Sequence, residues 1–411
     1  MNYEARRNQM MEQMEEETLL ILYSGVPAHI SADAYYEFEA NRHFFYLTGL
    51  RRENMVLLMR KSGGNSRVTL YIEKADPTAE RWTGKMVTVE EAKEISQIQD
   101  VRFVDRFDAE VNYLLNNANV SCCYFDCFRN QSTDLPDYNL SKAQQFAANY
   151  PGVQLRNLWA MASQLRMQKD KDEVTLIQQA VDVTRQALQY VMTNLKPGMK
   201  EYQAQADFEY MVHYLGAEGP SFQTIAGSGK NGCMLHYETN RETCQDGSLL
   251  LLDLGTRWQG YCSDITRTYP VNGKFTDRQR QVYEIVLRAN KEVAAQAKPG
   301  MTTRELNDIC KKVLAAGCME LGLIEKEEEI GKYYMHGVSH HLGIDVHDVT
   351  VEGMKLAPGS VITDEPGLYI DEWEIGIRIE DDLLITEDGC EILSAGIIKE
   401  PDEIEAFMAK R

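Results

Sequence analysis

Residues 249–271 read LLLLDLGTRWQGYCSDITRTYPV, two runs of strand-forming residues separated by a short stretch with a turn-compatible glycine. This pattern predicts a β-hairpin. If the chain reverses between Trp258 and Gln259, Asp253 and Asp264 lie directly opposite each other on one face, with Cβ atoms about 4.5 to 5.5 Å apart. The hairpin is therefore expected to bring two carboxylates together.

A second hairpin with the same property is predicted later in the chain. Residues 361–370 read VITDEPGLYI, and residues 375–386 read IGIRIEDDLLIT. Glu365 and Glu380 are equally distant from a turn at residues 372–373, so they are expected to oppose each other across the two strands. Each hairpin thus places two acids face to face.

The two hairpins belong to an internal repeat. The phrase KPGM occurs at residues 196–199 and again at 298–301, and each copy opens an amphipathic helix. Gly247 stands six residues before Asp253, and Gly359 stands six residues before Glu365. Two similar halves of this kind predict a pseudo-symmetric α+β domain with a cleft between the halves.

Four acids in two opposed pairs carry an electrostatic cost, which rises as a cleft excludes water. A cation offsets that cost, or one acid of each pair holds a proton. Solvated hairpin acids without a ligand are the simplest alternative. However, Asp253 follows four leucines, and Glu365 and Glu380 lie among apolar strand residues. The pattern therefore favours two divalent ions about 3.5 to 4 Å apart.

Histidines gather in the same part of the chain. Five of the eight histidines lie between His236 and His347, most of them in residues 335–348, MHGVSHHLGIDVHD. Mixed carboxylate and imidazole ligands suit manganese, iron, cobalt or zinc, and no cysteine is placed to form a thiolate site. The histidine cluster is an independent indication of a metal centre.

Such a centre is suited to the hydrolysis of an amide or an ester. Two ions bridged by carboxylates hold a water between them, lower its pKa, and offset the charge of a tetrahedral intermediate. Glu365 is the candidate for moving a proton from that water to the leaving nitrogen. His236 and His347 are candidates for hydrogen bonds to the substrate.

The part of the chain before residue 165 is expected to form a separate α/β domain. Runs rich in β-formers, TLLILYS, FFYLTGL, NMVLLMR and RVTLYIEK, alternate there with helical patterns. A long helical pattern from Lys171 to Leu195 then begins a second domain. We therefore expect domains at 1–165 and 166–411, a division that suits a chain of 411 residues.

Composition excludes several classes of protein. Acidic residues outnumber basic ones 63 to 43, for a net charge of −20, so nucleic acid is not an expected partner. Residues 1–17 lack the apolar core of a secretory signal, and no run of about 18 apolar residues predicts a membrane span. Nine scattered cysteines do not resemble a disulfide framework. A cytoplasmic protein is expected.

Five stretches resemble, in the same order, those of the pita-bread metallopeptidases and especially the bacterial-type Xaa-Pro aminopeptidases (aminopeptidase P). They are LLLLDLG, GYCSDITRTYPVNGKF, MHGVSHHLGIDVHD, DEPGLYI and GIRIEDD, all within residues 170–400. FFYLTG and AERWTG resemble the N-terminal domain of that family. The resemblance implies release of the N-terminal residue from peptides with proline second, two ions that are usually manganese, and a homodimer or homotetramer.

The resemblance also implies a role for each site residue. One ion would be bound by Asp253 and Asp264, and the other by Asp264, His340, Glu365 and Glu380, so that Asp264 and Glu380 bridge. The substrate and proton-relay histidines would be His236, His336 and His347, and the supporting residues of the pocket Tyr369 and Arg378.

Two positions depart from the family pattern. His341 stands where close relatives often carry tryptophan, and Asp364 where valine is usual. Strand alternation points Asp364 away from the face of Glu365, so it is not expected to be a ligand. His341, next to His340, is expected to change the polarity of the pocket and with it the substrate or metal preference.

Two alternatives remain open. Prolidase, an Xaa-Pro dipeptidase, shares the fold, the ions and the preference for proline, and differs in whether a residue follows the proline. A non-catalytic binding member of the fold is the alternative from another class. Such relatives typically lose metal ligands, whereas this chain retains all five, which argues against that alternative.

Overall fold

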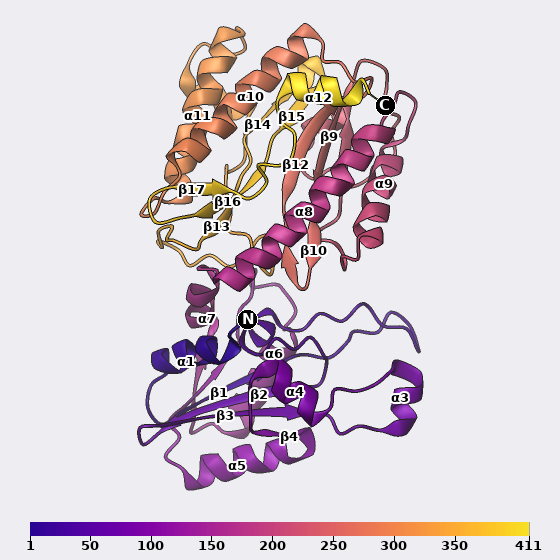
Figure 1. The fold of residues 1–411 in the computed structure, drawn as a ribbon. Helices are drawn as coiled ribbons and strands as arrows, with labels where there is room; N and C mark the ends of the chain where they lie inside the picture. The colour runs from indigo at the N-terminus through magenta and orange to yellow at the C-terminus, as the bar shows by residue number, and fades with distance from the viewer. Residues whose placement is uncertain (411) are drawn as a thin grey trace. The chain divides into compact units, whose positions relative to one another are not determined.

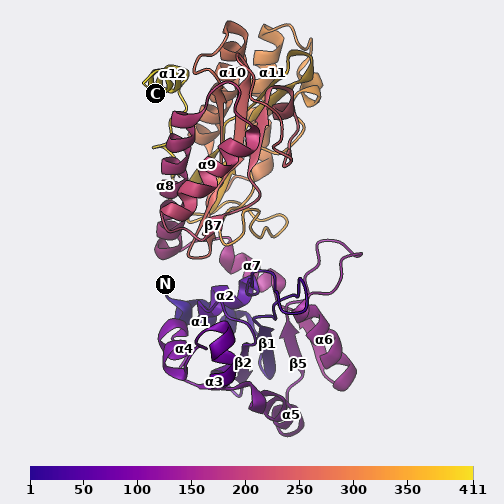
Figure 2. The same cartoon turned by 90° about the vertical axis from the view of Figure 1, so that its right-hand side faces the viewer.

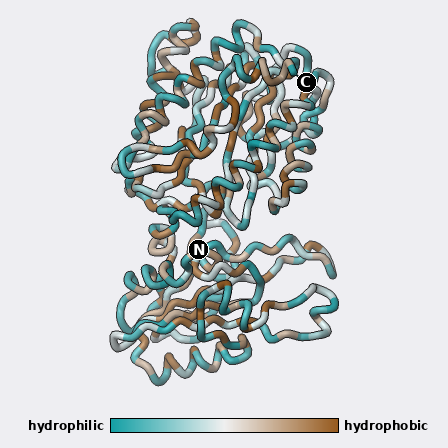
Figure 3. Tube along the Cα trace, viewed as in Figure 1, coloured by the Kyte–Doolittle hydropathy of each residue, from teal (hydrophilic) through white to brown (hydrophobic). Residues whose placement is uncertain are grey.

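The computed structural model describes residues 1–410. They divide into two compact units, Met1–Arg166 and Met167–Arg411 (Figure 1). In each unit the hydrophobic residues gather along the central strands (Figure 3). Each unit therefore has a core of its own.

The first unit is built on a mixed six-stranded sheet. Its strand order is β4-β3-β2-β1-β5-β6, with antiparallel pairing among β1, β2 and β3 and parallel pairing of the other neighbours. The strands are β1 (Thr18–Tyr23), β2 (Val56–Ser62), β3 (Asn65–Ile72), β4 (Val101–Phe103), β5 (Cys122–Phe125) and β6 (Gln154–Asn157). The helices are α1 (Tyr3–Gln13), α2 (Arg42–Thr48), α3 (Pro77–Thr83), α4 (Val89–Ser96), η1 (Val104–Arg106), α5 (Phe107–Asn117), α6 (Tyr138–Asn149) and α7 (Trp159–Arg166). This arrangement confirms the α/β prediction for the first unit.

One element of this unit was predicted wrongly. The run FFYLTGL, expected among the β-forming segments, lies in helix α2 and the residues that end it. The Asn41 side chain accepts hydrogen bonds from the backbone of His43 and Phe44, and Gly49 ends the helix at φ 72°. The two caps satisfy the free backbone groups of a short helix, and this local effect outweighs the strand preference of phenylalanine and tyrosine.

The second unit contains two helical pairs and several short sheets. Its helices are α8 (Lys171–Asn194), α9 (Glu201–Tyr214), η2 (Gly229–Cys233), α10 (Asp277–Gln296), α11 (Thr303–Glu320), η3 (Glu327–Lys332), η4 (Asp371–Trp373) and α12 (Pro401–Met408). Its strands are β7 (Gly219–Pro220), β8 (Ile225–Ser228), β9 (Leu249–Leu254), β10 (Thr256–Trp258), β11 (Tyr261–Cys262), β12 (Ile265–Pro270), β13 (Val361–Asp364), β14 (Gly367–Ile370), β15 (Ile375–Arg378), β16 (Asp381–Ile385) and β17 (Cys390–Ile392). The sheet orders are β11-β10-β7, β12-β9-β8, β13-β16-β17 and β14-β15.

The internal repeat is visible in this order of elements. Helices α8 and α9 pack against each other before the β9–β12 hairpin, and α10 and α11 do so before the β13–β16 hairpin (Figures 1 and 2). The KPGM phrases form the turns within the two helical pairs, and their glycines, Gly198 and Gly300, adopt φ values of 89° and 88°. Glycine is the residue that adopts this conformation at the lowest cost. The pseudo-symmetric α+β prediction is therefore confirmed.

The register of the second hairpin agrees with the prediction. Asp364 pairs with Asp381 on one side and Gly367 with Arg378 on the other. The intervening residues Glu365 and Glu380 therefore lie opposite each other, at the break between the two short sheets.

The register of the first hairpin differs from the prediction. Asp253 pairs with Thr266, not with Asp264. The reversal is at Gln259 and Gly260, whose φ values of 47° and 84° are those of a type I′ turn. Because this turn requires positive φ at both central residues, its centre lies one residue later than predicted. Asp264 consequently stands just before β12, diagonal to Asp253.

The close approach of Gly255 to Ser263 and Ser221 in this hairpin provides a test of the packing. A Cβ atom on Gly255 would overlap the carbonyl oxygen of Ser263 and the hydroxyl of Ser221. We expect Gly255→Ala to lower the free energy of unfolding by about 1 to 3 kcal/mol, measured by urea denaturation. Gly389→Ala is the matched control, because a Cβ there meets nothing within 4 Å. Equal stability of the two variants would show that the close approach at Gly255 does not require a glycine.

Candidate active site

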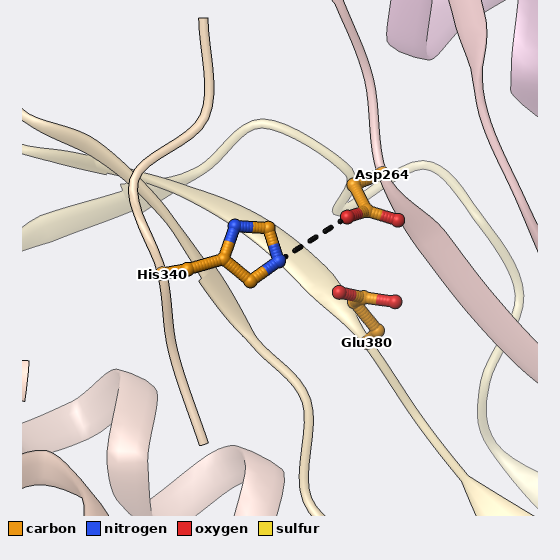
Figure 4. Close-up of side chains that lie close together, drawn as sticks. All are labelled: Asp264, His340 and Glu380. Atoms are coloured by element: carbon orange, nitrogen blue, oxygen red, sulfur yellow. Dashed lines mark ion pairs between the residues drawn. The ribbon is translucent and has the colours of Figure 1, made fainter. Parts of the chain in front are cut away.

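Three of the predicted ligands converge in the second unit. Asp264 lies between β11 and β12, Glu380 between β15 and β16, and His340 in the irregular segment before β13. Each offers one ligand atom, and these atoms all lie within 4.8 Å of one another (Figure 4). Nε2 of His340 is 3.4 Å from Oδ2 of Asp264. The cluster joins strands from both halves of the repeat.

Glu365 approaches the same nitrogen of the His340 ring as Asp264 does. Its Oε1 is 3.6 Å from His340 Nε2, and its backbone N–H donates to the carbonyl of Val338. The His340 backbone N–H donates to the Thr363 hydroxyl, and His340 Nδ1 lies 3.1 Å from the carbonyl oxygen of His341. A proton on Nδ1 makes that last contact a hydrogen bond, so in the neutral ring the lone pair is on Nε2, the nitrogen nearest the acids.

Asp253 connects the cluster to a chain of polar side chains. Nη2 of Arg378 donates to Oδ2 of Asp253 at 2.5 Å, and Nη1 donates to the Tyr369 hydroxyl at 2.9 Å. That hydroxyl is 2.8 Å from Nε2 of His336, whose Nδ1 is 2.8 Å from the Gly337 carbonyl. Since the carbonyl needs a proton on Nδ1, the tyrosine donates to Nε2.

The remaining histidines surround this cluster. The His347 ring stacks on that of His340, with centroids 3.9 Å apart and planes 12° from parallel. His236 is exposed and lies near enough to His336 and His347 to influence both electrostatically. The structure thus brings three predicted ligands into one group, with Glu365 and His347 against His340 and Asp253 connected through Arg378.

Two supporting residues were missed in the sequence. Thr266 donates its hydroxyl to Oε2 of Glu380 at 2.7 Å and accepts the Glu380 backbone N–H at its carbonyl. Asp382 accepts the backbone N–H of Asp264 at 3.2 Å. The available signal for Thr266 was its position two residues after Asp264, on the same face of the strand.

The two departures from the family pattern are both buried. Asp364 is fully inaccessible and accepts a hydrogen bond from Asn290 at 3.2 Å, which confirms that it points away from the cluster. His341 is 2% exposed, with Lys169 and Asp348 as charged neighbours. Its effect on substrate or metal preference stays a prediction.

The electrostatics of the acids fit a bound cation. Burial and the neighbouring carboxylates raise the pKa of Asp264 and Glu380, and burial raises that of Glu365 to about 7. Burial opposes the charged form of His340, but Asp264 raises the His340 pKa to about 9. Oδ1 of Asp253 has no hydrogen-bond partner among residues 1–410. Crowded oxygen donors, an imidazole and an unpartnered carboxylate oxygen are the donor set that divalent transition metals take.

The neighbouring histidines are held neutral. Burial lowers the pKa of His336 and of His347 to about 4 each. Neutral imidazoles can accept or donate a single proton in hydrogen bonds without adding positive charge beside a cation.

The chain matches two family models and is similar to known proteins along its whole length. Residues 175–387 match metallopeptidase family M24, and residues 3–124 match the aminopeptidase P N-terminal domain. The Xaa-Pro aminopeptidase of Escherichia coli K12 is 34% identical, over 99% of this chain and 97% of that protein.

Solved structures of other proteins have a similar fold. A Bacillus anthracis structure described as a candidate aminopeptidase P superposes with a TM-score of 0.97 at 42% identity, covering 99% of this chain and 98% of the other. Aminopeptidase P from E. coli with the inhibitor Pro-Leu gives 0.89 at 32% identity, covering 100% and 98%.

The fold and the site together define a metallopeptidase with a preceding α/β unit. The chain belongs to metallopeptidase family M24, and its first unit carries the aminopeptidase P N-terminal domain. Its catalytic unit has the pita-bread fold. Separately, none of the helices within residues 1–410 combines the length and apolar character that a bilayer crossing requires.

Metal removal should destabilise the protein more at higher pH. Glu365 and His340 have folded pKa values raised to about 7 and about 9. Groups with raised pKa values stabilise the fold fully below their unfolded pKa, and this contribution is lost as pH rises through the folded pKa. The lowered pKa values of His336 and His347 act in the opposite sense, but only below about pH 6.5.

We therefore expect the Tm of the chelator-treated protein to fall between pH 6.5 and 8.5, while the metal-loaded protein changes little. The gap between the two should widen by about 3 to 5 °C in differential scanning calorimetry. A gap that stays constant or narrows would show that these groups do not titrate in the metal-free site.

Proposed function

We propose that this protein is an Xaa-Pro aminopeptidase, which releases the N-terminal residue from peptides with proline in the second position. The observation that carries the proposal is the cluster of Asp264, His340 and Glu380, with ligand atoms within 4.8 Å, beside Glu365. Full-length similarity to proteins named Xaa-Pro aminopeptidase supports it.

The proposed centre holds two divalent ions, most suitably manganese, with zinc, cobalt and iron as alternatives. The residues that would hold them are Asp253, Asp264, His340, Glu365 and Glu380, three of which already offer ligand atoms within 4.8 Å of one another. Ions bound there would activate water for attack on the peptide carbonyl and offset the charge that develops on its oxygen.

The residues of the chain then handle protons and position. Glu365, which lies 3.6 Å from His340, would take a proton from the nucleophilic water and return it to the leaving prolyl nitrogen. His236 and His347 bind the substrate backbone, and the Tyr369–His336 hydrogen bond supplies a relay at the edge of the site. Arg378 orients Asp253 through a hydrogen bond to its Oδ2. Arg378 is itself oriented by a hydrogen bond of 3.1 Å from its Nε to the Thr266 hydroxyl.

We further propose that the enzyme works in the cytoplasm as a homodimer or homotetramer on proline-containing peptides. The nine cysteines are all free, which suits a reducing compartment. The proposed cytoplasmic location rests on these free thiols.

Substrate length decides between the two proline-specific activities. With manganese supplied, alanine should be released from Ala-Pro-Ala much faster than from Ala-Pro, and Ala-Ala-Ala should be a poor substrate. Release is measured by chromatography of free alanine. A preference for Ala-Pro would instead identify a prolidase, and cleavage of none would favour a non-catalytic member of the fold.

A single substitution tests the metal centre itself. Asp264→Ala should reduce bound metal in elemental analysis and lower kcat by at least about a thousandfold, because the removed carboxylate is proposed to bridge both ions. Asp388→Ala, at an exposed acid of the same unit, is the control and should match the unchanged protein. Retained turnover in a folded Asp264→Ala protein would disprove the two-metal proposal.

A further inference from the structure

A buried ion pair lies against the loop that connects His340 with His347. Nζ of Lys169 is 3.0 Å from Oδ2 of Asp348, and each side chain is 1% exposed. Neither residue belongs to the ligand cluster. Asp348 directly follows His347, so the pair is attached to the end of the loop that carries the proposed substrate histidine.

The loop is closed by a backbone hydrogen bond to the His341 carbonyl, which the His340 ring also contacts. The His341 carbonyl accepts the backbone N–H of Asp348 at 2.8 Å, and Nδ1 of His340 lies 3.1 Å from the same oxygen. The backbone N–H of Gly343 donates to the Asp345 carbonyl within the loop. A shift of Asp348 would therefore move His347, the residue that directly precedes it in the chain.

Lys169 is itself firmly held. Its backbone N–H donates to the Gly359 carbonyl at 2.8 Å. Gly343 leaves room for the ion pair, because a Cβ there would overlap Oδ2 of Asp348 and lie 2.8 Å from Cε of Lys169. The absence of a side chain at this position is thus a requirement of the pair.

A second attachment holds the loop to the strands that carry Asp264. The backbone N–H of Cys262 donates to the Gly343 carbonyl at 2.8 Å, and the Cys262 thiol lies 3.4 Å from the Ile344 carbonyl. The loop is consequently fixed at strand β11 and at Lys169. The two fixed points leave the His347 ring little freedom to leave the face of His340.

Stability alone is a weak reason for such a pair. Removing two charges from water costs several kcal/mol for each ion, and a buried pair is often no more stabilising than apolar residues of the same size. What a fully buried pair does supply is a defined geometry, since one partner without the other is strongly unfavourable.

We propose that Lys169 and Asp348 are positioning residues that hold loop 341–348 so that His347 stacks on His340 and faces the substrate. This proposal rests on the proposed function, because it takes His347 as a substrate-binding residue. Lys169 acts only through Asp348 and has no part in the chemistry.

The test removes the pair in two ways. Asp348→Asn with Lys169→Met removes both charges together and avoids a lone buried ion, and Gly343→Ala pushes into the pair without changing any charge. Each should lower kcat/KM for Ala-Pro-Ala by about tenfold, mainly through KM, because small displacements of a binding group are costly. Bound metal should be unchanged.

Combination with His347→Ala separates positioning from a general structural role. If the pair acts through His347, the double charge removal should cost about tenfold in the unchanged background and less than twofold in the His347→Ala background. The same loss in both backgrounds would overturn the proposal while leaving the proposed function intact. No effect of His347→Ala itself would overturn both the role of that histidine and this inference.

Hydrogen exchange gives a readout that does not need activity. The amides of loop 341–348 should exchange faster in the charge-removal variant, and those of β9 should not. Glu320→Gln, which breaks the exposed 3.2 Å pair between Arg288 and Glu320 in the same unit, is the control and should change neither exchange nor kcat/KM. Unchanged protection of the loop in the charge-removal variant would overturn the proposal even if the protein hydrolysed no peptide.

Discussion

The mutual repulsion of buried carboxylates is the constraint on which the second unit depends. Asp264 and Glu380 are 4% and 2% exposed, and burial raises the pKa of both. Asp253 raises the pKa of Asp264 further, and Asp264 raises that of Glu380. Such crowding is unfavourable in any protein that lacks a compensating cation. The fold must therefore hold the acids against their own repulsion, and Thr266, Arg378 and the stacked histidines all contribute to holding them.

The internal repeat explains how the acids come together but only part of how they are placed. The Glu365–Glu380 pair followed from spacing alone, because that hairpin keeps a regular register through its centre. The Asp253–Asp264 pair did not, because a turn at Gln259 and Gly260 moved the register. Sequence spacing locates a carboxylate to within a residue or two, whereas the turn type decides which residues face each other.

The supporting hydrogen bonds between the halves could not be predicted from spacing. Thr266 lies on β12 and Glu380 beyond β15, and only the assembled fold brings the hydroxyl to the carboxylate. The contact between the His340 ring and the His341 carbonyl could not be predicted either, because it involves the backbone of His341 and not its side chain. Conversely, FFYLTGL shows that local caps can override the β-preference of a whole apolar run.

The consecutive acids Glu380 and Asp381 differ in whether the chain itself supplies a positive charge to balance them. Asp381 is as buried as Glu380, yet Arg267 and Lys399 reach it at 2.7 and 2.5 Å and, against the effect of burial, hold its pKa below the usual range. The pKa of Glu380 is instead raised by burial and by neighbouring acids. Because adjacent strand residues point to opposite faces, one face of this segment receives its cations from the chain. The other face is left negative, and that difference makes it a site for cations from solution.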